Sequence, residues 1–289
     1  MNSFWQAIAA HIAATTNSPF EIETQISVSG GCINDGYKIS GSACHYFVKL
    51  NRPNQLAMFA AEALGLEQMR ATETICVPKP ICWGETQSNS YIVLEWLSLG
   101  SGNGAAWRAM GRQLAAMHRA GGSLQFGWDR NNTIGSTPQI NSWTDNWADF
   151  WAETRIGYQL RLAKRNGGQF PDLKQVIERV RALLQDHEPQ PALVHGDLWS
   201  GNAAIATDST PVIFDPAAYY GDREVDIAMT ELFGGFAPSF YQGYNDVWPL
   251  DLSYSDRRDL YNLYQILNHF NLFGGGYGSQ ANRIIERFL

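Results

Sequence analysis

The segment from residue 192 to residue 215 limits the possible folds of this chain more than any other. Ala192 to Val194 and Val212 to Phe214 are short apolar runs typical of buried strands, and a polar loop lies between them. Asp215 follows the second run directly. Two strands that end in polar residues predict a site formed around this loop. The loop contains one octapeptide: His195, Gly196, Asp197, Leu198, Trp199, Ser200, Gly201 and Asn202.

The spacing of the polar residues indicates phosphoryl transfer. In a kinase catalytic loop, an aspartate that orients the acceptor hydroxyl is followed five residues later by an asparagine that holds a metal ion. Asp197 and Asn202 have this spacing, and Asp215 stands where kinases place the aspartate that bridges Mg²⁺ to the nucleotide phosphates. Each residue type alone more often caps a turn or a helix, so the prediction depends on all three occurring together.

Composition and charge narrow the class of protein. The chain has 289 residues, 45% of them hydrophobic, which suffices for one large or two modest globular domains. A net charge of -7 without a basic cluster argues against a nucleic-acid partner. Apolar stretches are too short for a bilayer span, and the first residues lack the blocks of a secretory signal. We expect a cytoplasmic protein without membrane contact, and a monomer.

The cysteines match no zinc-binding spacing, so reduced thiols are the default expectation. Cys32 has two interpretations, because it follows Gly30 and Gly31 in a loop that we expect to cover phosphates. It is either a redox-sensitive thiol with a lowered pKa or an inert small residue in a tight loop. The four cysteines are Cys32, Cys44, Cys76 and Cys82.

The first hundred residues predict a nucleotide-binding lobe. An amphipathic helix around residues 4–12 precedes three antiparallel strands with a glycine-rich turn after the first. Lys49 lies between two apolar residues of the third strand, so its ammonium group is expected on the opposite face, toward phosphates. Glu62, on a helix from Asn54 to about Met69, is available to pair with it. The expected strands are Glu21 to Ser29, Tyr37 to Ile39 and Tyr46 to Leu50.

A buried strand from Tyr91 to Leu97 ends this lobe. We expect the main chain of Glu95, Trp96 and Leu97 to hydrogen-bond the adenine, and the glycine and serine run at residues 100–102 to separate a domain of residues 1–99 from one of residues 100–289. Helical periodicity dominates the second domain. The expected helices cover residues 105–120, 143–164, 173–184, 260–267 and 283–288. The fold class is therefore α+β and bilobal, with a small antiparallel sheet lobe and a larger, mostly helical lobe.

Several segments beyond these motifs carry a family resemblance. They are Gly30 to Asn34, Phe47 to Lys49, Met58 with Phe59 and Glu62, Pro138 with Gln139 and Asn141, Trp147 with Phe150, the loop at 195–202, Asp215 to Ala217 with Tyr220 and Gly221, and Leu232 to Phe236. On these residues the chain resembles the fructosamine kinases, also called ketosamine-3-kinases. That family lies within the protein-kinase-like and aminoglycoside-phosphotransferase-like fold.

The resemblance implies an enzyme that uses ATP and Mg²⁺ to phosphorylate the 3-hydroxyl of a ketosamine. The phosphoester then eliminates, which repairs glycated amines or lysines; fructosamines, ribulosamines and erythrulosamines are the implied substrates. Asp197 is the implied catalytic carboxylate, and Asn202 and Asp215 are the implied metal ligands. The implied ATP-binding residues are Gly30, Gly31, Cys32, Asn34, Lys49, Glu62, Glu95, Trp96 and Leu97.

The acceptor side is less determined by the sequence. Trp199 either stacks on the sugar or packs in the second lobe. Tyr219 and Asp222 are candidates for lining the acceptor pocket together with Asp197. We expect Asp226 to hold the backbone of the catalytic loop and His195 to act as a buried scaffold. Two other functions stay open: a kinase of this fold acting on an aminoglycoside, choline or homoserine hydroxyl, and a nucleotide-binding scaffold without turnover.

Overall fold

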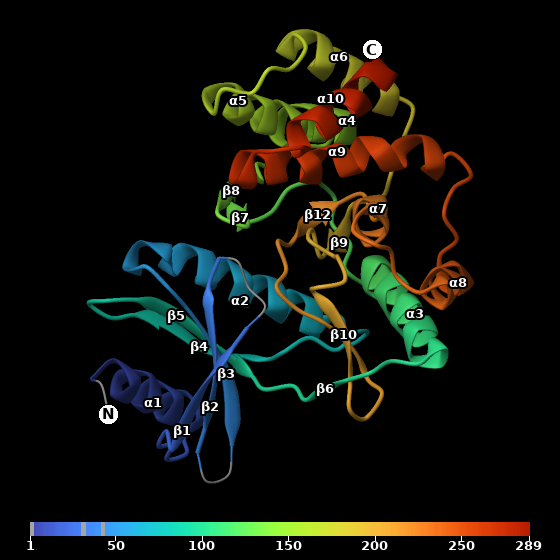
Figure 1. Cartoon of the computed structure of the whole chain (residues 1–289). Helices are drawn as coiled ribbons and strands as arrows, with labels where there is room; N and C mark the ends of the chain where they lie inside the picture. Colours follow the sequence, from blue (N-terminus) through green and yellow to red (C-terminus); the bar gives the residue numbers. More distant parts are fainter. Residues whose placement is uncertain (1–2, 30–32, 42–43) are drawn as a thin grey trace.

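The computed structural model describes residues 3–29, 33–41 and 44–289, and Figure 1 shows them arranged in two lobes. The N-terminal lobe is built on an antiparallel five-stranded sheet with the order β1-β2-β3-β5-β4. Alternation places Val48 and Leu50 on one face of this sheet and Lys49 on the other. The strands are β1 (Thr24–Val28), β2 (Asp35–Ser40), β3 (His45–Asn51), β4 (Pro80–Glu85) and β5 (Ser90–Glu95).

Each face of the sheet is covered by one helix. The helix α1 (Ser3–Thr16) buries Ile8 and Ile12 against Val48 and its neighbours, and these residues form a separate small core. The helix α2 (Leu56–Ala71), which follows the 3-10 turn η1 (Pro53–Gln55), covers the other face and joins the main core through residues such as Phe59. In Figure 1, α2 lies on the side of the sheet that faces the second lobe.

The C-terminal lobe is mostly helical and contains three small sheets. Their orders are β11-β10-β6, β12-β9 and β7-β8. The strands are β6 (Leu99–Gly100), β7 (Asn132–Ile134), β8 (Thr137–Gln139), β9 (Ala192–Val194), β10 (Ala203–Ala206), β11 (Pro211–Ile213) and β12 (Tyr219–Gly221). The helices are α3 (Gly104–Ala120), α4 (Trp147–Asp149), the π-helix η2 (Phe150–Gly157), α5 (Tyr158–Arg165), α6 (Leu173–Leu184), α7 (Glu224–Leu232), α8 (Pro238–Val247), α9 (Tyr254–Phe273) and α10 (Tyr277–Phe288).

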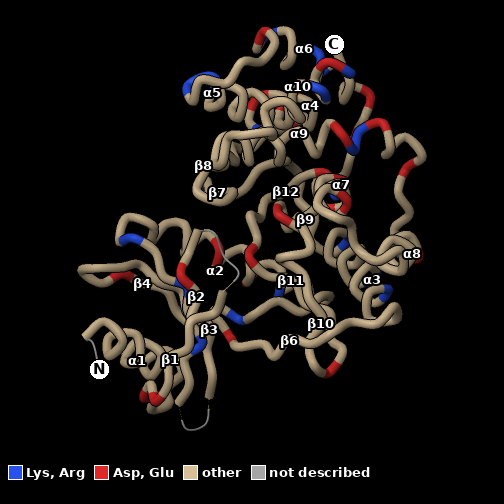
Figure 2. The backbone as a smooth tube through the Cα atoms, in the orientation of Figure 1, with Lys and Arg blue, Asp and Glu red and all other residues tan. Residues whose placement is uncertain are grey.

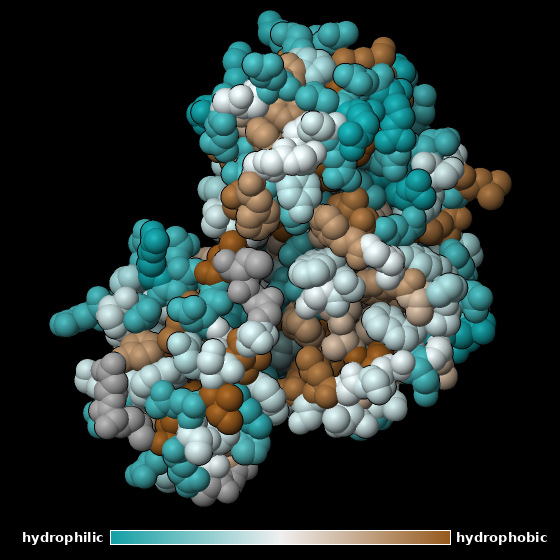
Figure 3. All heavy atoms as spheres, viewed as in Figure 1, coloured by the Kyte–Doolittle hydropathy of each residue, from teal (hydrophilic) through white to brown (hydrophobic). Residues whose placement is uncertain are grey.

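The chain enters the second lobe just after β5. Leu99 and Gly100 already pair with β10 of that lobe, so the crossing segment is short. The exact division at residues 99 and 100 stays a prediction. In the view of Figure 3 the surface is hollowed between the two lobes.

The bilobal α+β class is confirmed, but several elements differ from the expectation. The strand β4 was missed, because Pro80 and Gly84 break its pattern and its register shifts between Pro80 and Cys82. The helix expected over residues 143–164 begins only at Trp147 and includes eight residues of π-helix. None of the described helices is long and apolar enough to cross a membrane.

Candidate active site

The strand β9 leads directly into the catalytic loop, and Gly196 forms the first turn of that loop. The φ angle of Gly196 is +80°, and a Cβ atom there would lie 2.3 Å from the carbonyl oxygen of Ala217. Only glycine combines that backbone angle with so close an approach. The main-chain N–H of Ala217 also donates to the carbonyl of His195 at 2.9 Å. The loop and the segment after Asp215 are therefore held directly against each other.

A buried carboxylate holds the main chain of the catalytic loop in place. Asp226, on the first turn of α7, accepts hydrogen bonds from the main-chain N–H groups of His195 at 2.7 Å and Gly196 at 2.8 Å. His118 of α3 contacts the same carboxylate at 3.1 Å through Nε2. This is the backbone-holding role expected for Asp226. Sequence reasoning missed His118, because the apolar stripe of α3 gives no sign that its last turn carries a functional side chain.

His195 is a structural residue of the loop. Its side chain is fully buried, and its Nε2 lies 2.9 Å from the carbonyl oxygen of Phe214, which directly follows β11. Burial lowers its pKa despite the nearby charge of Asp226, which keeps the ring neutral at physiological pH. His195 therefore ties the catalytic loop to the residue that precedes Asp215.

Asp197 and Asn202 face each other across the loop. The Asn202 amide donates through Nδ2 to the Asp197 main-chain oxygen at 2.8 Å and to Asp197 Oδ2 at 3.0 Å. No described residue donates to Asn202 Oδ1 or to Asp197 Oδ1. Since both amide hydrogens are used, Asn202 presents its oxygen, which is the atom that Mg²⁺ prefers.

The carboxyl group of Asp197 is a stronger base than an ordinary aspartate. Burial raises its pKa to about 7, and the negative charge of Asp215 adds to this, while the hydrogen bond from Asn202 opposes it. A carboxylate with a pKa near the working pH is suited to accept a proton from a hydroxyl group.

Lys49 joins the two lobes through two carboxylates. Its Nζ lies 2.6 Å from Glu62 Oε1 of α2, and it also pairs with Asp215 of the C-terminal lobe. Burial by itself would lower the pKa of Lys49, but the charges of Asp215 and Glu62 raise it above its usual value, so the amine stays protonated. The pairing with Glu62 that the sequence suggested is thus present, and Asp215 joins it.

Asp215 adopts a backbone conformation that residues other than glycine rarely take. Its φ angle is +60°, which costs roughly 1 to 3 kcal/mol and persists only where the surroundings enforce it. Its side chain is 42% exposed, so part of the carboxylate remains open to a ligand while part pairs with Lys49. Strain of this kind at a half-open carboxylate is typical of functional sites.

These residues fit a magnesium nucleotide. An open carboxylate at Asp215 and an unpaired amide oxygen at Asn202 are hard oxygen ligands, which Mg²⁺ selects. The Lys49 ammonium group supplies a fixed positive charge beside them, suited to phosphate oxygens. Asn202 and Asp215 would hold the metal ion and Lys49 the phosphates.

The helix α2 packs directly on the segment after Asp215. A Cβ atom on Gly65 would lie 3.0 Å from Cβ of Ala218 and 3.7 Å from the ring of Pro216. The indole N–H of Trp128 also donates to Gln68 Oε1 of this helix at 2.8 Å. The position of Glu62 is therefore set by contact between the lobes.

Gly65→Leu is expected to push α2 away from this segment and to separate Glu62 from Lys49. Overpacking at such a contact costs about 1 to 3 kcal/mol, and we expect kcat/KM to fall by about tenfold or more. Ala57→Leu, at an exposed position of the same helix, is the matched control. Steady-state kinetics and thermal melting of both variants check this; equal activity in the two would show that the contact does not matter.

The remaining nucleotide-side residues are only partly described. Gly30, Gly31 and Cys32 lie outside the described residues. Asn34 accepts a hydrogen bond from Asn51 Nδ2 at 2.7 Å, which anchors the start of β2 to the end of β3. Glu95 is the last residue of β5, and no described residue hydrogen-bonds the main chain of Trp96 or Leu97. The main-chain N–H of Glu95 donates to the carbonyl of Lys79 at 2.9 Å. Adenine binding by the main chain of these three residues stays a prediction.

Trp199 lies at the surface of the catalytic loop with its side chain 37% exposed. Its indole lies over Gly201, where a Cβ atom would come within 2.3 Å of the ring. Its other neighbour is Phe233, with ring centroids 6.4 Å apart in an edge arrangement. The indole is thus half-buried, and part of it stays exposed on the loop that carries Asp197.

The predicted acceptor role of Tyr219 needs correction. Tyr219 pairs with Val194 in the β12-β9 sheet, and its side chain is buried. The guanidinium group of Arg155 lies 4.1 Å from the centre of its ring. Strand alternation turns Tyr219 inward, and the three-residue strand β12 was too short to be recognised in the sequence.

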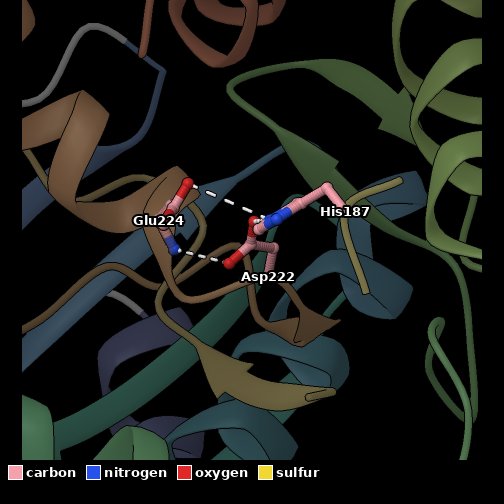
Figure 4. Close-up of side chains that lie close together, drawn as sticks. All are labelled: His187, Asp222 and Glu224. Carbon is pink, nitrogen blue, oxygen red and sulfur yellow. Dashed lines mark hydrogen bonds and ion pairs between the residues drawn. The ribbon is translucent and has the colours of Figure 1, made fainter. Parts of the chain in front are cut away.

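The predicted acceptor role of Asp222 also needs correction. Its Oδ2 accepts from Tyr261 at 2.6 Å and lies 2.7 Å from Nε2 of His187, and its Oδ1 accepts from the main-chain N–H of Glu224. Figure 2 shows acidic positions gathered at this end of α7, and Figure 4 shows Asp222 turned toward His187 and Glu224. Burial opposes ionisation, but the hydrogen bonds from His187, the Glu224 main chain and Tyr261 lower the pKa of Asp222. Asp222 is an internal anchor and not a substrate contact.

Comparison with known proteins decides the family. The fructosamine kinase family profile matches residues 4–289. The chain belongs to the fructosamine kinase family. A protein of Synechocystis named a probable ketoamine kinase is 60% identical over 99% of this chain and 97% of its own length. A chloroplastic protein-ribulosamine 3-kinase of Arabidopsis thaliana is 46% identical over 91% of this chain and 82% of its own length.

Solved structures agree with the fructosamine kinase fold. A Haemophilus somnus protein assigned to the fructosamine-3-kinases superposes with a TM-score of 0.93 at 31% identity, covering 99% of this chain and 97% of that one. An aminoglycoside phosphotransferase in complex with ADP and hygromycin B superposes with a TM-score of 0.65 at 16% identity, covering 97% and 98%. The latter shows the shared kinase fold alone.

Proposed function

We propose that this fructosamine kinase family member transfers a phosphoryl group from Mg²⁺-ATP to the 3-hydroxyl of a ketosamine. The observation that carries the proposal is the meeting of Lys49, Asp197, Asn202 and Asp215 at one place between the lobes. The names of the Synechocystis and Arabidopsis relatives support a ketosamine as the acceptor. We further propose that the protein acts as a monomer on small ketosamines or glycated lysines, and its compartment stays a prediction.

The chain's own residues have separate roles in this proposal. Asp197 Oδ1, which accepts no hydrogen bond from a described residue, would accept the proton of the 3-hydroxyl. The hydroxyl oxygen would bond to the γ-phosphorus of ATP, and the bond from that phosphorus to the bridging oxygen would break to release ADP. Lys49 binds phosphate oxygens, and Asn202 and Asp215 hold the metal ion. When bound, Mg²⁺-ATP supplies the phosphoryl group and the charge that stabilises its transfer. The product is a 3-phosphate, which suits later elimination and hence deglycation repair.

An acceptor panel separates this function from its alternatives. Purified protein with Mg²⁺-ATP is offered lysine-linked erythrulosamine, ribulosamine and fructosamine, together with kanamycin, choline and homoserine, and ADP release is measured. Turnover of at least one ketosamine is expected, with none of the other three acceptors. Turnover of kanamycin or choline alone would refute the acceptor class, and ATP binding without any transfer would favour the scaffold interpretation.

Trp199→Ala is expected to weaken acceptor binding selectively. An indole stacked on a sugar or on an aliphatic arm contributes about 1 to 2 kcal/mol, so the ketosamine KM should rise about tenfold while the KM for ATP stays within about twofold. Trp143→Ala is the matched control, because that tryptophan is similarly exposed, at 39% against 37%, and stacks on Tyr220. Steady-state kinetics with each substrate varied in turn gives the answer. An unchanged ketosamine KM would mean that Trp199 serves packing alone.

A further inference from the structure

A group of three side-chain amides, two of them buried and one half-buried, lies behind the segment that carries Asp215. Asn132 is in β7, Gln139 is in β8, and Asn141 follows two residues later. Asn141 Nδ2 donates to Asn132 Oδ1 at 2.9 Å, and Gln139 Nε2 donates to the same oxygen at 2.8 Å. None of the three takes part in the reaction proposed above.

Two of the amides donate to main-chain carbonyl groups close to Asp215. Gln139 Nε2 donates to the carbonyl oxygen of Ala217 at 3.0 Å, and Asn132 Nδ2 donates to that of Ala218 at 2.8 Å. These two residues follow Asp215 and Pro216 directly. The segment that must hold Asp215 at a φ angle of +60° is therefore fixed by two side-chain donors just beyond it.

Arg155 of the π-helix η2 determines how these amides are turned. Its Nη2 donates to Asn141 Oδ1 at 2.7 Å, and its Nη1 donates to the carbonyl of Ile140 at 2.5 Å. A guanidinium group can only donate, so Asn141 must turn its oxygen to Arg155 and its NH₂ group to Asn132. Asn132 must then turn its own NH₂ group to Ala218. One cation thus fixes the direction of donation along the whole group.

Arg155 is an unusual residue to find in this position. It is fully buried, and among the described residues no carboxylate forms an ion pair with it. The rings of Phe150 and Tyr219 lie over its guanidinium at 4.5 and 4.1 Å. Burying a cation without a carboxylate partner costs free energy, so a role in orienting the amides is a reason for its presence.

We propose that Gln139 and Asn132, oriented by Arg155, are positioning residues for Asp215. They hold the carbonyl groups of Ala217 and Ala218, and this keeps the strained Asp215 backbone where its carboxylate reaches the metal ion. The inference rests on the proposed function to the extent that Asp215 is a metal ligand, but not on the identity of the acceptor.

The test measures nucleotide binding and not turnover. Calorimetric titration with ADP, with and without Mg²⁺, is carried out on the native protein and on Gln139→Leu, which removes the donor to Ala217. Outer-shell partners of metal ligands typically contribute about 10- to 100-fold to metal affinity, so Gln139→Leu should lose about tenfold or more in ADP affinity with Mg²⁺. Its ADP affinity without Mg²⁺ should stay within about twofold of native.

Gln159→Leu is the matched control. Gln159 is also a buried amide of this lobe, but it bonds to Asn268 and Asn271 and to none of the described residues 215–218. It should lower the melting temperature without a selective loss of Mg²⁺-dependent binding. If Gln139→Leu does not fold, Asn132→Ala at its half-buried position should show the same selective loss.

Two results would overturn the inference: native Mg²⁺-ADP affinity in the Gln139 and Asn132 variants, or an equal loss with and without the metal ion. If the acceptor is not a ketosamine, these titrations should still give the expected results. A native protein whose ADP affinity does not depend on Mg²⁺ would overturn the proposed function and this inference together.

Discussion

Asp197→Asn is expected to reduce kcat for ketosamine phosphorylation about 10³-fold, because an amide cannot accept the proton of the acceptor hydroxyl. Binding of Mg²⁺-ATP should be nearly unchanged, since asparagine keeps the shape of the side chain and can still accept from Asn202. Asp186→Asn, an exposed substitution of the same chemical type, is the control. A variant that retains more than about a tenth of native kcat would show that Asp197 is not the base.

The same substitution is expected to stabilise the metal-free protein. The folded protein raises the pKa of Asp197 to about 7, whereas in the unfolded chain it is near 4. Folding therefore binds the proton more tightly, and the free-energy cost of the ionised group is absent below pH 4, grows between pH 4 and 7, and is complete above pH 7. Asp197→Asn should gain about 4 kcal/mol of unfolding free energy at pH 8, which is about three pKa units at roughly 1.4 kcal/mol each, and almost nothing at pH 4. Thermal melting at the two pH values measures this, and a gain of equal size at both would contradict the assigned pKa.

Lys49→Met is expected to cause a large loss of both activity and stability. The substitution removes the positive charge that meets the phosphates and leaves Glu62 and Asp215 without their common partner. Removing one such electrostatic contact typically lowers kcat by about 10²- to 10³-fold, and the unpaired buried carboxylate of Glu62 should destabilise the fold by about 3 kcal/mol or more. Lys79→Met, an exposed lysine of the same lobe, should change neither property.

The loss of activity and the loss of stability in Lys49→Met can be separated by a second substitution. The double variant Lys49→Met with Glu62→Gln removes the unpaired charge on α2, so stability should return in part while activity stays low. Chemical unfolding and kinetics of the single and double variants test this. Recovery of activity together with stability would mean that Lys49 acts only through the fold.

The sequence predicted those parts of the site that lie within one loop. Asp197 and Asn202 are five residues apart on a single turn, so their spacing alone fixes their geometry. The contact of Lys49 with Glu62 was also accessible, because strand alternation points Lys49 toward the helix that follows. In these cases local periodicity decides which way a side chain faces.

Apart from the role of Asp226, the parts that depend on packing between distant segments were not predicted. The acceptor role expected for Tyr219 was wrong, because the direction of its side chain depends on the pairing of β12 with β9. The buried role of Asp222 depends on His187 and Tyr261, which lie far from it in sequence. Two of the amides behind Asp215 belong to β7 and β8 and the third, Asn141, follows β8, and these strands are too short to give a pattern.

The most direct test of the account is a ³¹P NMR spectrum of the protein with Mg²⁺-ATP and a lysine-linked ribulosamine. Native protein is expected to give ADP and a new phosphate monoester on the 3-oxygen of the sugar, and Asp197→Asn is expected to give neither. Unchanged ATP signals, or a monoester that forms equally well with the Asp197 variant, would contradict it.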